Sequence, residues 1–290
     1  MADWLVAHEG AARLSIFLGV FALMALWETT APRRRRAFSR GRRWLTNGLI
    51  TVIDAAVVRL LLIAIGVAGA WDAARGGWGL FNWLDWPFWI EVVITLIVLD
   101  LVIYWQHVLS HWIPFLWRFH RVHHADRDFD VTTAVRFHPI EIAYSMLLKL
   151  GVVYLLGPPA AAVILFEVIL NGAAMFNHSN IRIPERLDRA LRWVIVTPDM
   201  HRVHHSALSP ETDRNFGFNL PWWDRLFGTY LAQPSKGHDG MTIGLNDYQN
   251  DAPTRLLWSL ALPFRTLGRQ AARHRAKAVS ERASRKETAG

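Results

Sequence analysis

Eight histidines recur with helical spacing in two parts of the chain. They are His107, His111, His120, His123, His124, His201, His204 and His205. The pentapeptide His-Arg-Val-His-His occurs twice among them, and on a helix its three histidines share one face. Imidazole binds iron, zinc, copper and nickel, and eight rings are more than one tetrahedral ion can use. The spacing therefore predicts a site for two metal ions.

Other uses of histidine fit this pattern less well. A helical zinc protease site requires His-Glu-x-x-His, and neither histidine group contains that glutamate. A haem protein uses isolated histidines on facing helices and has no need of adjacent His-His pairs. Ordinary surface or core histidines explain a single ring better than eight of the thirteen in one register. We therefore favour the two-metal interpretation.

Long apolar runs indicate the elements that must position these histidines. The chain has 290 residues, of which 52% are hydrophobic. Several runs lie near the ~20 residues that a bilayer-spanning helix needs, although the first and the last two are short. They are Leu14–Trp27, Leu45–Trp71, Phe88–Trp105, Ile140–Leu156 and Ala160–Phe176. Because one chain of this length could hardly bury so many core helices, we predict an all-α, polytopic membrane bundle of four to five transmembrane helices with a histidine-rich metal-binding cap.

Basic residues favour one orientation of this bundle. The formal net charge is +8, concentrated in two segments. They are Arg33, Arg34, Arg35, Arg36, Arg40, Arg42 and Arg43, and the tail from Arg265 to Lys286. The positive-inside rule places both segments and both histidine groups in the cytoplasm, with the loop Trp71–Pro87 outside. We expect an integral protein of the bacterial inner membrane with a cytoplasmic active site, and no nucleic-acid binding, since no recognition module accompanies the charge.

Composition also suggests three segments. We expect a membrane helix and basic loop at 1–44, a catalytic domain at 45–235, and a basic tail at 236–290. The N-terminus lacks the basic region and cleavage site of a secretory signal, so the first run is expected to remain as a helix. The absence of cysteine excludes disulfides, thiolate-ligated iron–sulfur clusters and thiol nucleophiles.

Polar residues near the histidines are candidates for supporting roles. Asp100 lies seven residues before His107 on the same helix face, where it could orient a ligand ring or simply be capped by a neighbouring helix. His138 precedes Pro139 at a helix start and could be a ligand or a cap. His178 is expected at the cytoplasmic end of the last span, and we favour it as a ligand. Lys149, inside an apolar run, is expected to snorkel.

With these motifs on view, the chain resembles the fatty acid hydroxylase superfamily, also called the sterol desaturase family, of integral membrane di-iron oxygenases. The resemblance runs from about Asp100 to Tyr230. It rests on His107-x3-His111, His120-x2-His123-His124, Arg136-x-His138-Pro139-x-Glu141, Asn177-His178, His201-x2-His204-His205, Asn215-Phe-Gly217 and Asp224-Arg-Leu-Phe-Gly228-Thr-Tyr230.

The resemblance implies a four-helix membrane core under a cytoplasmic cap, two irons, dioxygen as co-substrate and a lipid C–H bond as target. Carried over by motif, the eight repeated histidines would be iron ligands and His178 a ninth, with Asp100, Glu141 and Asn215 as catalytic candidates. Members acting on sphingolipid acyl chains tend to have a further histidine where this chain has Arg182. That departure favours the branch that acts on sterols, alkylglycerols and bacterial lipids.

The expected reaction needs partners that this chain does not contain. Oxidation of an unactivated C–H bond requires a redox metal, for which zinc can substitute after overexpression. Electrons would come from an external ferredoxin, cytochrome or reductase, and the substrate would be an acyl chain, a sterol or an ether lipid. We expect hydroxylation rather than desaturation. A non-oxidative metal-binding or transport protein is the alternative, although transporters place their ligands near the bilayer midplane.

Overall fold

A computed structural model describes residues 8–65, 76–84 and 86–266 of the chain. Over these residues the structure is helical, and its only β pairings are two isolated bridges. Five helices are long and apolar enough to cross a membrane. They are α2 (Glu9–Thr30), α3 (Arg40–Ile65), α5 (Phe88–Trp112), α7 (Pro139–Leu156) and α8 (Ala160–Asn177). The predicted all-α bundle is thus confirmed, while the part of the second run beyond Ile65 and most of the tail lie outside the described residues.

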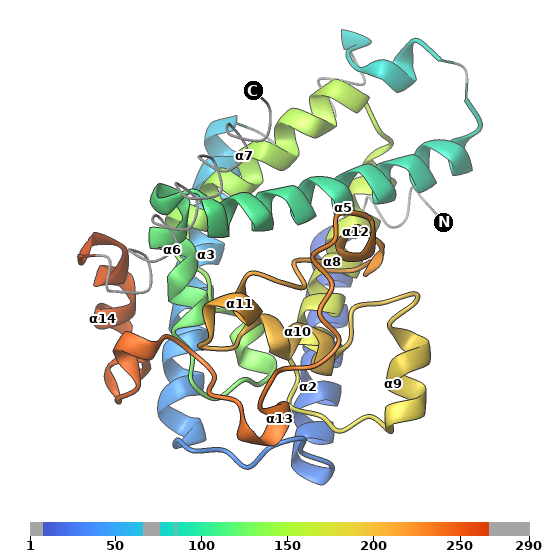
Figure 1. The fold of residues 1–290 in the computed structure, drawn as a ribbon. Helices are drawn as coiled ribbons and strands as arrows, with labels where there is room; N and C mark the ends of the chain where they lie inside the picture. Colours follow the sequence, from blue (N-terminus) through green and yellow to red (C-terminus); the bar gives the residue numbers. More distant parts are fainter. Residues whose placement is uncertain (1–7, 66–75, 85, 267–290) are drawn as a thin grey trace, which may run out of the picture.

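Short helices connect and cap this bundle. The α-helices are α6 (Pro114–His124), α9 (Glu185–Leu191), α10 (Pro198–His204), α11 (Ser209–Thr212), α12 (Trp222–Leu226), α13 (Gly237–Gly240) and α14 (Leu256–Ala261). The 3-10 turns are η1 (Leu80–Asn82), η2 (Val131–Val135), η3 (Asn246–Tyr248), η4 (Ala252–Thr254) and η5 (Leu262–Phe264). Figure 1 shows α5 and α7 at one end of the molecule and α10, α11 and α13 toward the other, with α2 and α3 running alongside.

Local sequence explains where the hairpin of α7 and α8 turns. Helix α7 ends at Gly157, which has a φ of 63°, and two prolines before α8 prevent the helix from continuing. Gly79 packs directly against this turn, where an added Cβ would lie 2.3 Å from the Gly157 nitrogen. The segment around Gly79 and the turn between α7 and α8 therefore lie together.

The start of α3 is fastened to the cap by a buried ionic network. Arg43 is 2% exposed, and its guanidinium donates to Asp126 at 2.7 and 2.8 Å and to Asp130 at 2.7 Å. Asn47, one turn later, donates to Asp126 and accepts from Arg136. This corrects the interpretation of the basic segment as topogenic charge alone, because Arg43 is a buried structural ion there. A guanidinium held by two carboxylates can be buried only because they compensate its charge.

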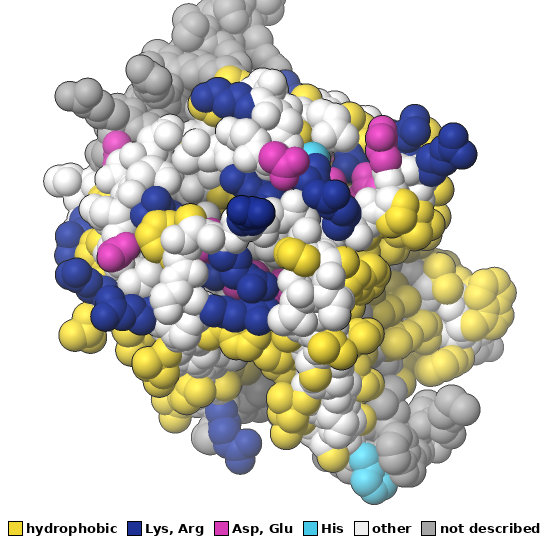
Figure 2. Space-filling view, turned by 90° about the horizontal axis from the view of Figure 1, so that it is seen from below, with side chains coloured by type: hydrophobic (Ala, Val, Ile, Leu, Met, Phe, Trp, Pro, Cys, Tyr) yellow, Lys and Arg dark blue, Asp and Glu magenta, His cyan; other side chains and the backbone are white. Residues whose placement is uncertain are grey.

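The three predicted segments pack together within the described residues. Helix α2 packs along α8, and the segment after residue 235 returns through η4, α14 and η5 to α3 and α6. The boundaries at 44 and 235 stay predictions. Figure 2 shows Lys and Arg side chains gathered on one face, whereas hydrophobic side chains dominate the parts that run away from it. The orientation of this face relative to the membrane stays a prediction.

Candidate metal centre

The structure brings nine buried histidines together in two groups. The first group contains His107, His111, His120, His124 and His204. The second contains His123, His178, His201 and His205. Within each group one ring nitrogen per residue lies within 4.8 Å of all the others. These are the nine histidines that the sequence nominated as ligands.

Each pentapeptide contributes to both groups. In the α6 pentapeptide, His120 and His124 belong to the first group and His123 to the second. In the α10 pentapeptide, His201 and His205 belong to the second group and His204 to the first. The sequence argument that the three rings share one face is too coarse. Adjacent positions point about 100° apart around a helix of 3.6 residues per turn, and the planes of the His123 and His124 rings are nearly perpendicular, at 87°. Neighbouring rings of one pentapeptide therefore serve different sites.

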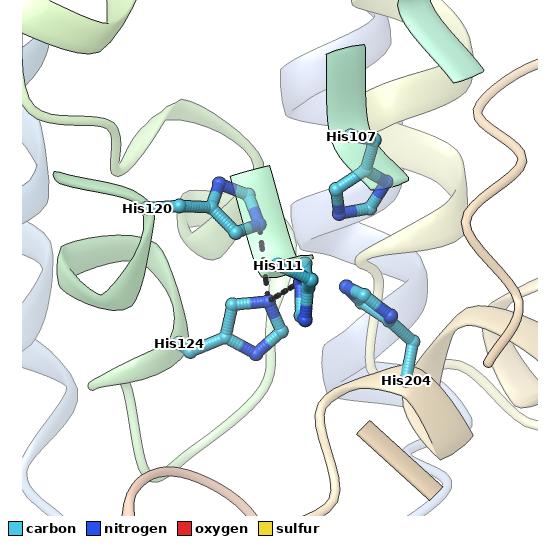
Figure 3. A group of neighbouring side chains, drawn as sticks. All are labelled: His107, His111, His120, His124 and His204. Atoms are coloured by element: carbon cyan, nitrogen blue, oxygen red, sulfur yellow. Dashed lines mark hydrogen bonds between the residues drawn. The ribbon is translucent and has the colours of Figure 1, made fainter. Parts of the chain in front are cut away.

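The ring nitrogens within a group converge too closely to be satisfied by one another. In the first group, His124 Nε2 lies 3.1 Å from His111 Nε2 and 3.2 Å from His120 Nε2 (Figure 3). In the second, His178 Nε2 lies 3.1 Å from the Nε2 atoms of both His123 and His201. An imidazole nitrogen carries either one proton or one lone pair, so it cannot form good hydrogen bonds to two such neighbours at once. Ligands on one ion with metal–nitrogen bonds of ~2.0–2.1 Å are roughly 2.8–3.4 Å apart, as these nitrogens are.

Backbone carbonyls fix the tautomer of three of these histidines. Each accepts a hydrogen bond from Nδ1 at 2.8 Å. The pairs are His107 with Phe216, His204 with Arg214, and His178 with Ala174. Since a carbonyl can only accept, Nδ1 carries the proton and the Nε2 lone pair faces the group. The buried Nε2 atoms of His107 and His204 have no hydrogen-bond partner among the described residues, which a bound cation would supply.

Carboxylates hold two further rings of the first group. His120 Nδ1 donates to Glu141 Oε1 at 2.6 Å, and His111 Nδ1 lies 3.4 Å from Asp213 Oδ1. A carboxylate behind a ligand ring fixes its orientation and makes the opposite nitrogen a better donor to a metal. The predicted candidate Glu141 therefore contacts the cluster through His120.

The cap histidines are held in the neutral form that binds metal. Burial lowers the pKa of His123, His124 and His205 well below the usual value, and the neighbouring imidazoles lower it further. Burial likewise lowers the pKa of His178 to about 3. A neutral, desolvated imidazole keeps a free lone pair at neutral pH. The donor set of the two groups thus fits two divalent cations.

Asp100 does not contact a histidine ring. Its Oδ2 accepts from Trp223 Nε1 at 2.8 Å and from the Leu220 nitrogen at 3.3 Å. This is the alternative in which a neighbouring segment caps the carboxylate. The segment in question also contains Phe216, whose carbonyl holds His107. Asp100 therefore acts on the cluster at one remove, as an anchor of that loop.

Sequence reasoning assigned no role to Asp224, which anchors the same loop more directly. Its Oδ1 accepts from the Phe216 nitrogen and its Oδ2 from the Gly217 nitrogen, both at 2.8 Å, while Thr229 Oγ1 donates at 2.6 Å. An added Cβ on Gly217 would lie 2.8 Å from Oδ2, so glycine is needed for this approach. Burial raises the pKa of Asp224 to about 6. The only sequence signal was its place in the motif around Asp224–Tyr230.

Asn215 also has a structural position. Its φ is 53°, its amide nitrogen donates to the carbonyls of Met200 and Leu231, and its oxygen accepts from the Leu231 nitrogen. The side chain thus ties Met200, in the first turn of α10, to Leu231. The residue before Asn215 is Arg214, whose carbonyl holds His204.

Two of the other histidines, His138 and His238, are buried outside both groups. His138 Nδ1 accepts from the Ile140 nitrogen and caps α7, and its Nε2 lies 3.2 Å from the Leu260 carbonyl. Of its two expected roles, the structure thus shows the cap. His238, which was given no role, is buried with its Nε2 3.5 Å from Asp199.

A cavity of about 360 Å³ opens from the first group into the helical bundle. Its lining includes His107, His120 and Glu141 at the histidine end, and Arg13, Lys149 and Glu167 in the spanning helices. This volume is within the range of small-molecule sites. A ligand in the cavity would reach the first group from within the bundle.

Comparisons with known proteins agree with the motifs. Residues 92–229 match the family model described as Fatty acid hydroxylase. An ornithine lipid hydroxylase from Rhizobium tropici is 28% identical over 261 residues, covering 88% of this chain and 76% of the relative. An alkylglycerol monooxygenase from Xenopus tropicalis is 29% identical over 169 residues, covering 57% of this chain. The human alkylglycerol monooxygenase is 26% identical over 155 residues, covering 52%.

The coverage of these relatives differs. The chain spans 35% and 33% of the two alkylglycerol monooxygenases, so much of their length has no counterpart in the match. No solved structure matches the chain.

Proposed function

Since the chain carries a fatty acid hydroxylase domain and is a member of that superfamily, we propose that it hydroxylates a membrane lipid at a centre of two iron ions. Dioxygen is the co-substrate, and an external ferredoxin, cytochrome or reductase supplies the electrons. The observation that carries the proposal is a pair of buried histidine groups, the first of which lines a cavity between helices long and apolar enough to cross a membrane.

The enzyme class follows from the relatives. They are hydroxylases and monooxygenases, which confirms the prediction of a lipid-hydroxylating oxidoreductase and does not favour a transporter. The relative that is similar over most of the chain is an ornithine lipid hydroxylase, others are alkylglycerol monooxygenases, and a further one from Lecanicillium is a fatty acid hydroxylase. Ornithine lipid and an alkylglycerol are therefore the first substrates to test, with a free fatty acid as the third.

Metal binding would involve two kinds of residue, histidine ligands and the groups that orient them. The Nε2 atoms of His107, His204 and His178 would bind the ions, because the carbonyls behind these rings hold their Nδ1 protons. Glu141 would keep His120 turned toward the first ion. When bound, iron supplies the redox chemistry for C–H oxidation, which no side chain provides. All nine histidines are proposed as ligands.

The cavity would orient the substrate. A lipid chain that enters between the spanning helices passes apolar side chains such as Phe17, Ile103 and Leu170 before it reaches His107. Burial of the chain excludes water from the reacting carbon. The basic face of the cap would lie on the cytoplasmic side of a bacterial inner membrane, where a soluble electron donor has access.

An isotope experiment tests the reaction. Purified iron-loaded protein is given a reductase system, labelled dioxygen and each lipid in turn, and the products are analysed by mass spectrometry. We expect one lipid to gain one labelled oxygen atom. A His124→Ala, His205→Ala double variant serves as the inactive control. A product two hydrogens lighter without label would indicate desaturation, and unchanged lipid with intact metal would refute an oxidative role.

A further inference from the structure

Three charged residues meet inside the membrane-spanning part of the cavity. Lys149 Nζ of α7 donates to Glu167 Oε1 of α8, and both side chains are 14% exposed. Arg13 of α2 approaches the other Glu167 oxygen at 3.7 Å. All three residues line the cavity. Lys149 therefore turns inward to an ion pair, and the prediction that it snorkels to the surface is wrong.

Charges are costly in this part of the bundle. Ionisable side chains within spanning helices face protein or a ligand path because lipid cannot solvate them. An apolar pair of similar volume would usually hold two helices together as well as a buried ion pair. Helix packing alone thus gives no reason for charges here. Their place in a cavity wall gives a reason for these charges, because a bound ligand can form ion pairs with them.

The charge at this end of the cavity is unbalanced. Two cations, Arg13 and Lys149, share the single carboxylate of Glu167. Glu9 lies 4.0 Å from Arg13, and the two side chains are 40% and 41% exposed, but only Arg13 lines the cavity. Solvent screens that outer contact more strongly than the contacts in the wall. The wall therefore carries about one uncompensated positive charge.

The other carboxyl groups of the cavity lie toward the histidine end. Glu141 is bonded to His120, and Asp54 is one turn beyond Thr51, whose hydroxyl donates to the carbonyl of Val135 in η2. Lys149 follows Glu141 by eight residues, or about 12 Å along α7 at the helical rise. The cavity thus has a cationic end in the membrane and an acidic end at the metal centre.

We propose that Arg13, Lys149 and Glu167 form a subsite that binds a monoanionic group of the lipid substrate. This assignment rests on the proposed function of the cavity as the lipid site. A carboxylate or a phosphodiester would balance the excess charge, whereas a phosphate monoester would exceed it. With its anionic group held there, the lipid presents to the metal centre a carbon further along its chain. The subsite would then select both the substrate and the position that is oxidised.

Equilibrium binding of two matched ligands tests the subsite without any turnover. Tritiated hexadecanoic acid and hexadecan-1-ol, which share a chain and differ in charge, are titrated into the purified protein in detergent micelles. Lys149→Met should weaken binding of the acid at least tenfold and change that of the alcohol less than twofold. Glu167→Gln should strengthen binding of the acid, because it removes the competing anion. The surface substitution Lys236→Met should change neither.

The variants also separate a ligand site from a structural ion pair. A Lys149→Met, Glu167→Gln double variant keeps the net charge of the wall through Arg13, so it should bind the acid within a few-fold of the wild type even if Lys149→Met folds poorly. Equal effects on acid and alcohol, or weaker binding of the acid by Glu167→Gln, would overturn the proposal.

A third ligand identifies the anionic group. Lysophosphatidylglycerol carries a phosphodiester, and the same dependence on Lys149 and Glu167 would extend the subsite to monoanions in general, whereas a response of the acid alone would assign it to carboxylates. Charge-dependent binding without oxidation of any lipid would count against the proposed function only. Oxidation with charge-independent binding would count against the subsite only.

Discussion

The loop behind His107 offers a sharp test of how the metal centre is held. In Asp224→Asn, the side chain keeps its shape but loses one acceptor. In the wild type, the two carboxylate oxygens of Asp224 accept from the Phe216 and Gly217 nitrogens separately. The amide of asparagine has only one oxygen that can accept. Its NH2 group would then face a backbone N–H. The Phe216 carbonyl, which orients His107, would lose its support.

The magnitude follows from these contacts. At least one buried backbone donor loses its partner, which costs about 1–3 kcal/mol of unfolding free energy. Loss of a group that orients a ligand ring typically weakens metal binding ~10–100-fold. The effect should be confined to the first group, since the second contains neither His107 nor His204. We therefore expect one of two ions to be weakly held and the other to be unchanged.

Metal retention against a graded chelator, read by mass spectrometry of the bound metal, measures this directly. Asp188→Asn is the matched control, because Asp188 is also a buried carboxylate. It lies in α9 and pairs at 2.6 Å with Arg192, the residue that follows this helix. The control should lower the melting temperature and leave both ions in place. If Asp224→Asn lowers the melting temperature while both ions are retained like the wild type, the loop does not position His107 and the reasoning is wrong.

Three further outcomes are expected. His124→Ala should deplete the ion of the first group and His205→Ala that of the second, with the double variant metal-free; full loading of the double variant would refute the ligand assignment. Arg43→Met should cost about 3–5 kcal/mol of unfolding free energy, because Asp126 and Asp130 keep buried charges, and chemical denaturation measures it. In this cysteine-free chain, a cysteine replacing exposed Trp83 should be labelled from outside intact cells and one replacing Lys236 should not; the reverse labelling would invert the proposed topology.

The histidine spacing was sufficient to nominate the residues but not to sort them. All nine nominated histidines come together, six from the pentapeptides at α6 and α10, two from α5 and His178 from the end of α8. Which ring joins which group depends on how the two helices are rotated relative to each other. That rotation is set by tertiary packing, for which a local pattern has no signal.

The groups that orient the rings were the hardest to predict. The carbonyls of Phe216, Arg214 and Ala174 leave no trace in the sequence, since every residue has a carbonyl. Asp100 was chosen for its spacing from His107, but spacing along one helix cannot show that its partner is Trp223, 123 residues away. Long-range contacts of this kind decide the role of a buried carboxylate.

The division of the pentapeptides has a mechanical consequence. Because each of α6 and α10 supplies rings to both groups, neither helix can move without disturbing both sites. The rings of His124 and His205, which belong to different groups, stack with centroids 4.5 Å apart and planes 19° apart, so the two sites share a wall. A centre built from one helix per ion would let the two ions shift independently. The interleaved arrangement instead couples the positions of the two histidine groups, so a shift of either helix would change both sites together.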